Sequence, residues 1–370
     1  MFYATNGWGL GHISRTLALA RQIRARDPLA KFLFLTDSEA INIVWQEGFA
    51  SVKMLPAEAV RRGFIDVDVK YTLNPAMATA TFASFQPDVF IADTYPVGRT
   101  QELFGALPSF ARSVLIYLEQ PESLRGDFAA NLRAYHLLLA PYEQSEVELP
   151  SPMRLPVEWT GYLLLRSRNE ALPRPEARRR LGLPQDAFIV YVGFGGGGDT
   201  RYGDFLGWAL RLAKRHPAWL FAVLVPPLAR EPMPEFAAEN IVTFSYFPLA
   251  EVFSAFDGAI SALGVGTTAE LLYFGVPTIF MPRPGLSDDH TGRASRIAAR
   301  GAGLIAEALD VKSLDAAAEK LADTTVRADL SAAARNMVSR NGAEVAAEFL
   351  LDWVKKDLSP RFGPARPTPT

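Results

Sequence analysis

The chain contains no cysteine, and histidine occurs only four times in its 370 residues. The absence of cysteine excludes a disulfide framework, a thiol nucleophile and a cysteine-ligated metal site. The four histidines, at positions 12, 136, 216 and 290, lie far apart in the sequence, which argues against a histidine zinc cluster. Any site that carries chemistry must therefore be built from other residue types or from a single histidine.

A basic excess and long apolar runs are also missing. A net charge of −2 and an isoelectric point near 6.2 argue against a nucleic-acid partner, which requires a concentrated basic face. No apolar run approaches the ~20 residues that span a bilayer. The first residues also lack the basic region and apolar core of a signal peptide. We expect a cytoplasmic protein without a transmembrane segment.

The composition, with 49% hydrophobic and 21% charged residues, is typical of a globular protein. The length is sufficient for two domains. Apolar strands alternate with helices in both halves of the chain, which is typical of Rossmann-like α/β domains with parallel sheets. After residue 163 the composition shifts to Arg, Pro and Glu, which indicates a linker. Residues 56–76 show no regular pattern, and we expect a mobile loop near the ligand site there.

The most informative stretch is residues 258–290, which predicts a strand, a glycine turn, a helix, a second strand and a polar loop. The glycine turn, Gly264 and Gly266, allows a ligand to approach the backbone closely. Thr267 and Thr268 open the helix, and a helix N-terminus behind a glycine turn favours an anion. Glu270, about one turn further on, is placed to accept hydrogen bonds from sugar hydroxyls. The pattern indicates a site for a nucleotide ribose diphosphate.

A second glycine-rich loop follows the predicted strand 188–192. Gly195 and Gly196 lie in it, and they either approach the diphosphate from the other side or form a flexible hinge. Arg201, just after the loop, would add positive charge, although most arginines in this chain must be solvated. Tyr246 follows the predicted strand 241–244, where an aromatic ring fits a nucleotide base or the core equally well.

In the first half, glycines 7, 9 and 11 precede His12. Their spacing does not match the dinucleotide fingerprint, which removes the main support for a nicotinamide site. Asp93 and Glu119 each end or follow a predicted strand, and ligands of open α/β sheets bind beyond these strand ends. We therefore expect His12, Asp93 and Glu119 at one rim. His12 is either a general base or a helix-start residue that binds phosphate, and Glu119 is either a second candidate base or an ordinary rim carboxylate.

Residues 258–290 resemble the donor-binding half of the GT-B glycosyltransferases. The resemblance is greatest to the family of the peptidoglycan lipid-intermediate N-acetylglucosaminyltransferase and the galactolipid synthases. The matching positions are Gly264, Thr267, Glu270, Gly275, Val276, Pro277, Asp289 and His290. The loop from Gly7 to His12 resembles the glycine-rich loop of the acceptor-binding half. Two departures occur: Ala262 and Leu263 replace a usual polar side chain, and His290 replaces a glutamine that touches the donor sugar.

The resemblance implies an α/β protein of the GT-B fold, with two Rossmann-like domains that face a central cleft. It implies an acceptor-binding domain at residues 1–163, a linker at 164–172 and a donor-binding domain at 173–342. A helix at 343–358 would cross back onto the first domain. The Pro-rich residues 359–370 are expected to form a disordered tail.

The resemblance also implies a hexosyltransferase that moves a sugar from a nucleotide diphosphate sugar, a UDP-sugar, to a hydroxyl, with inversion. His12 or Glu119 would deprotonate the acceptor, and Asp93 would orient His12. The helix N-terminus would stabilise the leaving diphosphate, so that neither a metal nor another cofactor is expected. The implied donor contacts are Gly195, Gly196, Arg201, Tyr246, Gly264, Gly266, Thr267, Thr268, Glu270, Asp289 and His290.

Other functions remain open on the same residues. Enzymes that hydrolyse or epimerise nucleotide sugars use this fold and place the same loop histidine near the anomeric carbon. A binding protein that has lost catalysis is a third interpretation, which the missing polar side chain at Ala262 favours. The acceptor is open as well, and a lipid-linked acceptor would make the protein a peripheral enzyme at the membrane surface.

Overall fold

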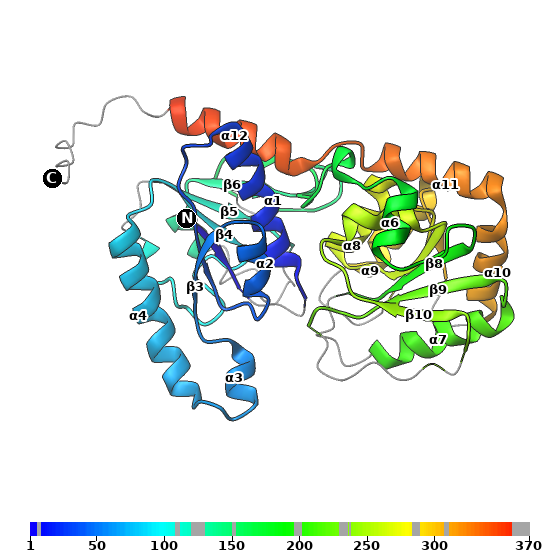
Figure 1. The fold of residues 1–370 in the computed structure, drawn as a ribbon. Coiled ribbons are helices and arrows are strands. Elements are labelled where there is room, and N and C mark those ends of the chain that lie inside the picture. The colour runs from blue at the N-terminus through cyan, green and yellow to red at the C-terminus, as the bar shows by residue number, and fades with distance from the viewer. Residues whose placement is uncertain are drawn as a thin grey trace.

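The computed structural model contains two α/β domains, joined by a connecting segment and by a helix near the C-terminus (Figure 1). It describes the chain except residues 6–8, 108–111, 120–129, 150–152, 196–201, 229–235, 237, 283–288, 307–310 and 357–370. The expected disordered tail therefore lies outside the described residues. Within the described part, no helix combines the length and hydrophobicity that crossing a membrane requires.

The first domain is built on a seven-stranded parallel sheet in the order β3-β2-β1-β4-β5-β6-β7. Its strands are β1 (Phe2–Ala4), β2 (Leu33–Thr36), β3 (Ala50–Lys53), β4 (Phe90–Asp93), β5 (Ser113–Ile116), β6 (Leu137–Ala140) and β7 (Val157–Trp159). Its helices include α1 (Gly11–Arg26), α2 (Ile41–Gln46), α3 (Ala57–Arg61), α4 (Val67–Phe85) and the 3-10 turn η3 (Leu132–Ala134). The central strands are apolar on both faces because both faces are buried.

The second domain repeats this architecture with six parallel strands in the order β10-β9-β8-β11-β12-β13. The strands are β8 (Phe188–Gly193), β9 (Trp219–Leu224), β10 (Ile241–Phe244), β11 (Gly258–Ala262), β12 (Thr278–Met281) and β13 (Leu304–Ile305). The helices include α6 (Arg174–Arg180), α7 (Tyr202–Arg215), η5 (Leu249–Ala255), α8 (Val265–Phe274), α9 (His290–Ala299), α10 (Val311–Ala322) and α11 (Thr324–Met337). In both sheets the strand order reverses next to the first strand, between β1 and β4 and between β8 and β11.

The last helix, α12 (Gly342–Lys356), returns to the first domain as the resemblance implied (Figure 1). Its apolar side chains, among them Ala346 and Leu350, share a buried cluster with Leu17 of α1. The chain enters this helix very close to the first domain, because a Cβ atom on Gly342 would lie 2.2 Å from the carbonyl oxygen of Gly161. Only glycine fits that approach.

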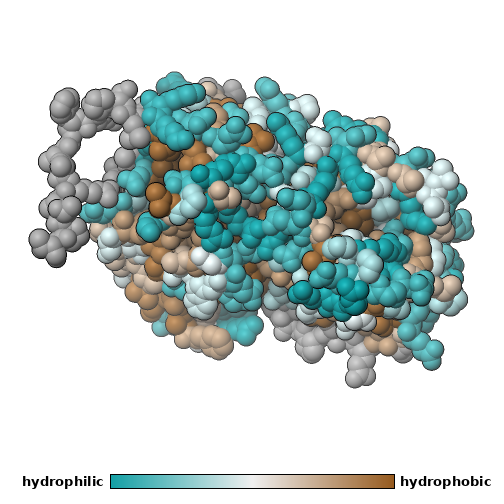
Figure 2. Space-filling model, turned by 45° about the horizontal axis from the view of Figure 1, so that its top comes forward, coloured by the Kyte–Doolittle hydropathy of each residue, from teal (hydrophilic) through white to brown (hydrophobic). Residues whose placement is uncertain are grey.

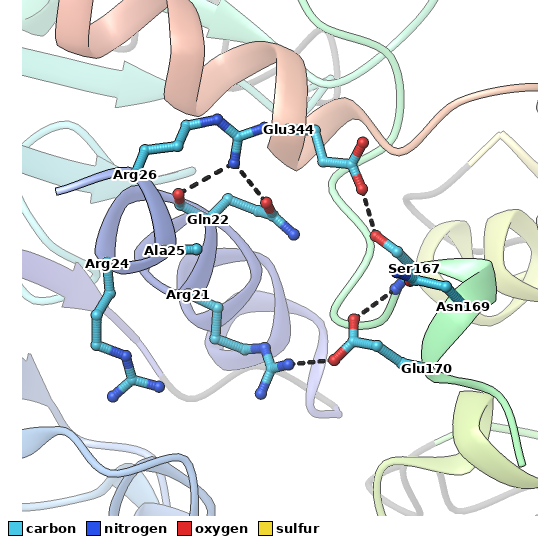
Figure 3. A pocket seen from close by; sticks show the side chains of 9 residues that line it. All are labelled: Arg21, Gln22, Arg24, Ala25, Arg26, Ser167, Asn169, Glu170 and Glu344. Carbon is cyan, nitrogen blue, oxygen red and sulfur yellow. Dashed lines mark hydrogen bonds and ion pairs between the residues drawn. The ribbon is translucent and has the colours of Figure 1, made fainter. Parts of the chain in front are cut away.

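An ion-pair network ties the connecting segment to both domains. Arg166 donates to Glu47 of the first domain (2.5 Å) and to Glu251 of the second (2.6 Å). Arg21 of α1 pairs with Glu47 and with Glu170, which follows in the 3-10 turn η4 (Arg168–Glu170). Figure 3 shows the shallow pocket of about 460 Å³ beside this network, where the Arg21–Glu170 pair lies across from the contact between Ser167 and Glu344.

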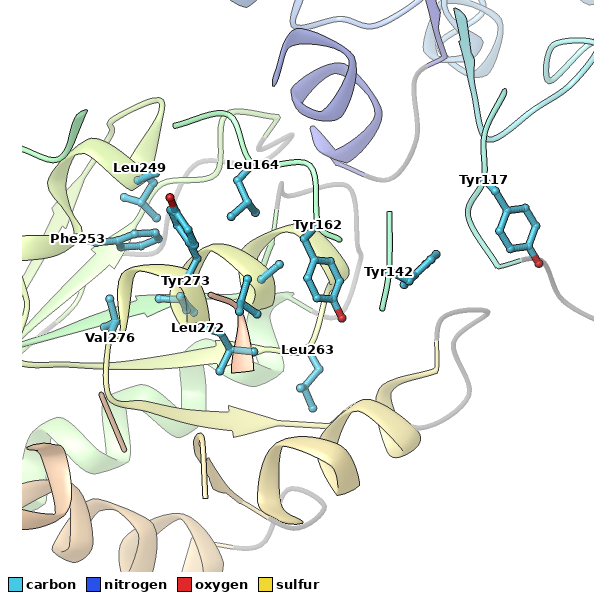
Figure 4. Close-up of a cluster of buried hydrophobic side chains, with 14 of the residues drawn as sticks. Tyr117, Tyr142, Tyr162, Leu164, Leu249, Phe253, Leu263, Leu272, Tyr273 and Val276 are labelled. Atoms are coloured by element: carbon cyan, nitrogen blue, oxygen red, sulfur yellow. The ribbon is translucent and has the colours of Figure 1, made fainter. Parts of the chain in front are cut away.

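The largest buried cluster continues from the first domain into the second (Figure 4). Tyr142 and Tyr162 pack edge to face with ring centres 6.2 Å apart. Leu164 of the connecting segment, together with Leu272 and Phe253 of the second domain, belongs to the same cluster. Buried apolar contacts therefore hold the connecting segment against the second domain. The exact domain boundaries stay a prediction.

Residues 56–76 were expected to form a mobile loop, and that prediction is wrong. They contain α3 and the first half of α4, whose buried face carries Lys70, Asn74, Ala78 and Phe82. Asn74 donates to and accepts from the backbone of Leu55 at 3.0 Å, and Lys70 lies 3.7 Å from Asp37. The buried face is thus polar over its first turns, so the apolar periodicity that predicts a helix is absent.

The outward face of this hairpin carries several exposed apolar side chains. Phe64 is 71% exposed and Tyr71 is 53% exposed, and Val67, Val69 and Leu73 are exposed beside them. Figure 2 shows hydrophobic residues gathered on the lower left of the molecule, on the side of the first domain. Because α3 starts shortly after the carboxyl end of β3, this surface belongs to the same edge of the sheet as the loop before α1.

Candidate active site

A cleft of about 490 Å³ lies between the domains and is lined by residues of both. In the first domain the lining includes the segment after β1 and the segment after β4. In the second domain it includes the segments after β8 and β11. These are the positions where each strand order reverses, and open α/β sheets bind ligands at such points. The fold therefore brings two ligand-binding edges to a single cleft.

His12 and Asp93 are in direct contact, as the sequence predicted for a base and its orienting residue. His12 is the second residue of α1 and lines the cleft, and Asp93 ends β4 and is fully buried behind it. The Nδ1 atom of His12 lies 2.5 Å from Oδ2 of Asp93. Burial raises the pKa of Asp93, but the charge of Arg15 and the hydrogen bonds from His12 and Arg15 outweigh that effect and hold the pKa below its ordinary value. An ionised Asp93 can only accept, so the proton of this hydrogen bond lies on Nδ1 of His12.

Three neighbours of this pair were not identified from the sequence. Arg15 donates to both oxygens of Asp93, at 3.1 and 2.8 Å. Thr94 adopts a left-handed backbone (φ 67°), which is unusual for a β-branched residue, and its hydroxyl donates to Asp93 at 3.3 Å. The ring of Tyr95 lies 5.9 Å from that of His12. The spacing of His12 and Arg15, three residues apart on one helix, was the signal that could have revealed Arg15.

Glu119, the second candidate base, lines the same cleft. It follows β5, next to β4 in the sheet, and its backbone amide donates to the hydroxyl of Tyr142 at 3.3 Å. The predicted rim is thus present, with His12 and Glu119 on the cleft wall and Asp93 behind them. The contact with a buried carboxylate distinguishes His12 as the better candidate base.

The facing wall is the N-terminal end of α8. Its N-cap residue is Gly264, and Gly264, Gly266 and Thr267 all line the cleft. A Cβ atom on either glycine would meet no other atom within 4 Å, so the space in front of these amides is open. Thr268 is buried instead, and its hydroxyl has no hydrogen-bond partner among the described residues. The exposed N–H groups and the helix dipole favour an anion at this end.

Glu270 lines the cleft one turn into α8. Its carboxylate has no hydrogen bond or ion pair with any described residue. Burial raises its pKa to about 7, an effect that the charge of Arg166 only partly offsets. A carboxylate in this state gains from any ligand that donates hydrogen bonds to it.

Two other predicted donor contacts also reach the cleft. Tyr246 lines it, and its hydroxyl donates to Glu251 at 2.9 Å. Gly195 lines it with a positive φ of 98°, a conformation that favours glycine. Gly196 and Arg201 lie outside the described residues.

Asp289 and His290 differ in position. Asp289 lines the cleft but also caps α9, because its carboxylate accepts a hydrogen bond from the amide of Gly292 at 2.8 Å. His290 is buried and is not among the described residues of the lining. Within the described part of the chain, no group of three His, Asp or Glu side chains is arranged to hold a metal ion.

Comparison with known proteins finds a family model that matches part of the second half of the chain. Residues 228–350 match the glycosyltransferase family 28 C-terminal domain. The matched residues include α8 with Glu270, as well as Asp289 and the first part of α12.

Curated relatives match a longer span of the chain. A UDP-N-acetylglucosamine--N-acetylmuramyl-(pentapeptide) pyrophosphoryl-undecaprenol N-acetylglucosamine transferase from Desulforudis audaxviator is 27% identical over 314 residues. That alignment covers 80% of this chain and 82% of the relative. The predicted resemblance and the predicted enzyme class, a glycosyltransferase, are confirmed.

Solved structures show the fold of the whole chain. The spinosyn forosaminyltransferase SpnP has a TM-score of 0.67 with 17% identity, and it covers 96% of this chain and 98% of that structure. The MurG of Acinetobacter baumannii has a TM-score of 0.58 with 15% identity, covering 96% and 99%. The predicted GT-B fold is confirmed.

Proposed function

We propose that the protein transfers a sugar from a UDP-sugar to an acceptor hydroxyl, with inversion and without a metal ion. The observation that carries this proposal is the pairing of two groups across a single cleft. On one wall stands His12, bonded to the buried Asp93, and on the other the open N-terminus of α8. The relatives' names make UDP-N-acetylglucosamine the first donor to test.

The geometry suggests the following steps. Nε2 of His12 accepts the proton of the acceptor hydroxyl, whose oxygen attacks the anomeric carbon. The bond from that carbon to the diphosphate breaks, and the departing oxygen keeps the electron pair. The first amides of α8 stabilise the charge that develops on the diphosphate. Because base and leaving group lie on opposite walls, attack and departure occur on opposite faces of the sugar, which gives inversion.

Glu270 completes the donor site. It follows the proposed diphosphate site by one helical turn, and the ribose of a nucleotide presents two hydroxyl donors. Its unpartnered carboxylate would accept these hydrogen bonds, which are of the stronger, charge-assisted kind. We propose that Gly195 and Tyr246 border the same donor.

The proposed reaction is expected to continue in excess EDTA. The amides of α8 supply the stabilisation that a divalent cation would otherwise give, and Asp289 already accepts a hydrogen bond from its own helix. The check is the rate of UDP release with and without chelator, followed by addition of Mg²⁺ or Mn²⁺. Complete loss of activity that either cation restores would contradict a metal-independent mechanism.

We propose a lipid-linked acceptor, because the relatives' names specify an undecaprenol-linked substrate and this chain exposes an apolar hairpin. Residues 57–73 contain three acidic and three basic side chains, so apolar insertion and not charge would drive membrane contact. Phe64→Ser with Tyr71→Ser should lower binding to phosphatidylcholine vesicles by about tenfold or more.

The matched control is Leu29→Ser, since Leu29 is an exposed apolar residue elsewhere on the first domain. Co-sedimentation with vesicles measures the binding. Binding that appears only when phosphatidylglycerol is added, or that Leu29→Ser reduces equally, would contradict insertion of the hairpin.

Product analysis tests the function itself. The protein is incubated with UDP-N-acetylglucosamine and the lipid-linked acceptor of the relatives, and the products are separated and identified by mass spectrometry. A new glycoside supports the proposal. Free N-acetylglucosamine alone identifies a hydrolase, an isomerised donor identifies an epimerase, and an unchanged donor that still binds identifies a binding protein.

A further inference from the structure

We propose that Arg15 is a positioning residue for the base: it fixes the carboxylate of Asp93 and, by its charge, keeps the imidazole of His12 neutral. The inference rests on the proposed function for the use of His12 as a base. The interaction of the three side chains, however, is a property of the free protein and can be measured without substrate.

The first part of the argument is geometric. Nε of Arg15 donates to Oδ1 of Asp93 at 3.1 Å, and Nη2 donates to Oδ2 at 2.8 Å. This two-point contact fixes the plane of the carboxylate, which a single hydrogen bond does not. Oδ2 also faces Nδ1 of His12 at 2.5 Å. Arg15 is 7% exposed, so its guanidinium is held in place by the surrounding structure.

The second part concerns the proton on the imidazole. Nη2 of Arg15 lies 3.2 Å from Nδ1 of His12. A guanidinium is always protonated and has no acceptor, so the proton on Nδ1 is held by the carboxylate alone. This arrangement places a permanent positive charge beside the ring. Protonation of Nε2 would add a second positive charge at the same short distance.

The charges of Asp93 and Arg15 act on His12 in opposite directions. An isolated carboxylate beside a histidine favours the imidazolium, which cannot act as a base. Arg15 neutralises that carboxylate, and Arg15 and His12 are the groups that lower the pKa of Asp93 against the effect of burial. The other titratable or charged groups on the described walls of the cleft are Tyr95, Arg99, Glu119, Tyr142, Tyr191, Tyr246, Glu270 and Asp289. None of them contacts the carboxylate, so Arg15 sets the local balance.

Proton NMR of the imidazole tests this directly, and a chain with four histidines makes the signals separable. The His12 signals are assigned by their loss in His12→Gln. In Arg15→Met the midpoint of the His12 titration should rise by about one to two pH units. Arg15→Lys keeps the charge and should stay near wild type. Arg26→Met, an exposed arginine on the same helix, is the matched control and should change nothing.

The double variant Arg15→Met with Asp93→Asn removes both buried charges, and its His12 midpoint should return towards the wild-type value. Should Arg15→Met fail to fold, Arg15→Gln removes the charge but keeps a hydrogen-bond donor to Asp93, and it carries the same expectation. An unchanged His12 midpoint in the folded charge-removing variant would overturn the proposal.

Kinetics supply the second measurement. The acidic limb of the pH–rate profile, followed as UDP release from UDP-N-acetylglucosamine, should move to higher pH in Arg15→Met by the same amount. Failure of the proposed function and failure of the role of Arg15 give different results. A wild-type protein that releases no UDP contradicts the proposed function and leaves the NMR comparison intact. Equal titrations in wild type and Arg15→Met contradict the role of Arg15 even when the wild type is active.

Discussion

His12→Ala is expected to lower kcat by about 10²–10⁴-fold while the donor Kd stays near wild type, because a general base contributes about that much to rate. The imidazole lies on the cleft wall opposite the proposed diphosphate site, so its removal should leave donor contacts in place. Asp93→Asn should have a smaller effect, since it disturbs the orientation of the ring and does not remove it. Steady-state rates of UDP release and UDP titrations measure both quantities.

The matched control for this variant is His216→Ala. His216 stacks on Trp219 in the second domain, away from the described lining of the cleft. Its loss should affect stability and leave kcat within a few-fold of wild type. A His12→Ala variant that keeps its kcat would place the base elsewhere, with Glu119 the next residue to test. Weakened donor binding with an unchanged kcat would indicate that His12 binds phosphate.

The second large effect is expected at Glu270. Glu270→Gln should raise the donor Kd by about 10–100-fold, because hydrogen bonds to a charged group contribute about 1.5–3 kcal/mol. Burial raises the pKa of Glu270 to about 7, so the donor should also bind more weakly as the pH falls below that value. The ionised carboxylate is the form that accepts two hydroxyl hydrogen bonds. Titrations of UDP between pH 6 and pH 8.5 measure both effects.

Glu270 should favour donor binding but lower the stability of the ligand-free protein. A carboxyl group whose pKa is raised on folding, here from 4.5 to about 7, destabilises the fold increasingly as the pH rises through that interval. Without ligand, Glu270→Gln should therefore melt at a higher temperature than wild type at pH 8 and at a similar one at pH 4.5. Glu348→Gln, an exposed residue on α12, is the matched control. A loss of both stability and donor affinity at pH 8 would indicate a structural role instead.

The contact between His12 and Asp93 could be predicted because both residues lie at the carboxyl ends of predicted strands. Asp93 ends an apolar strand, His12 follows another, and the carboxyl ends of neighbouring parallel strands meet at one edge. Glu270 and the glycine turn before α8 could be predicted because helix start signals are local in sequence. The comparisons support the fold and the family and do not test these roles.

Other features depend on contacts that a sequence pattern does not record. Arg15 was not identified from the sequence, because its partner Asp93 is 78 residues away. The α4 helix was missed because its buried face carries Lys70 and Asn74, whose partners also come from distant segments. The left-handed backbone of Thr94 has no local signal either, since glycine or asparagine is the usual residue there. Long-range polar contacts therefore account for most of what the sequence left undetermined.

The central claim is that attack and departure occur from opposite walls of the cleft, with His12 on one and α8 on the other. The most direct test is the anomeric form of the first product when water replaces the acceptor. The donor UDP-N-acetylglucosamine carries an α bond, and proton NMR distinguishes the two anomers before they equilibrate. Inversion predicts that β-N-acetylglucosamine appears first. Initial release of the α anomer would contradict the proposed placement of base and leaving group.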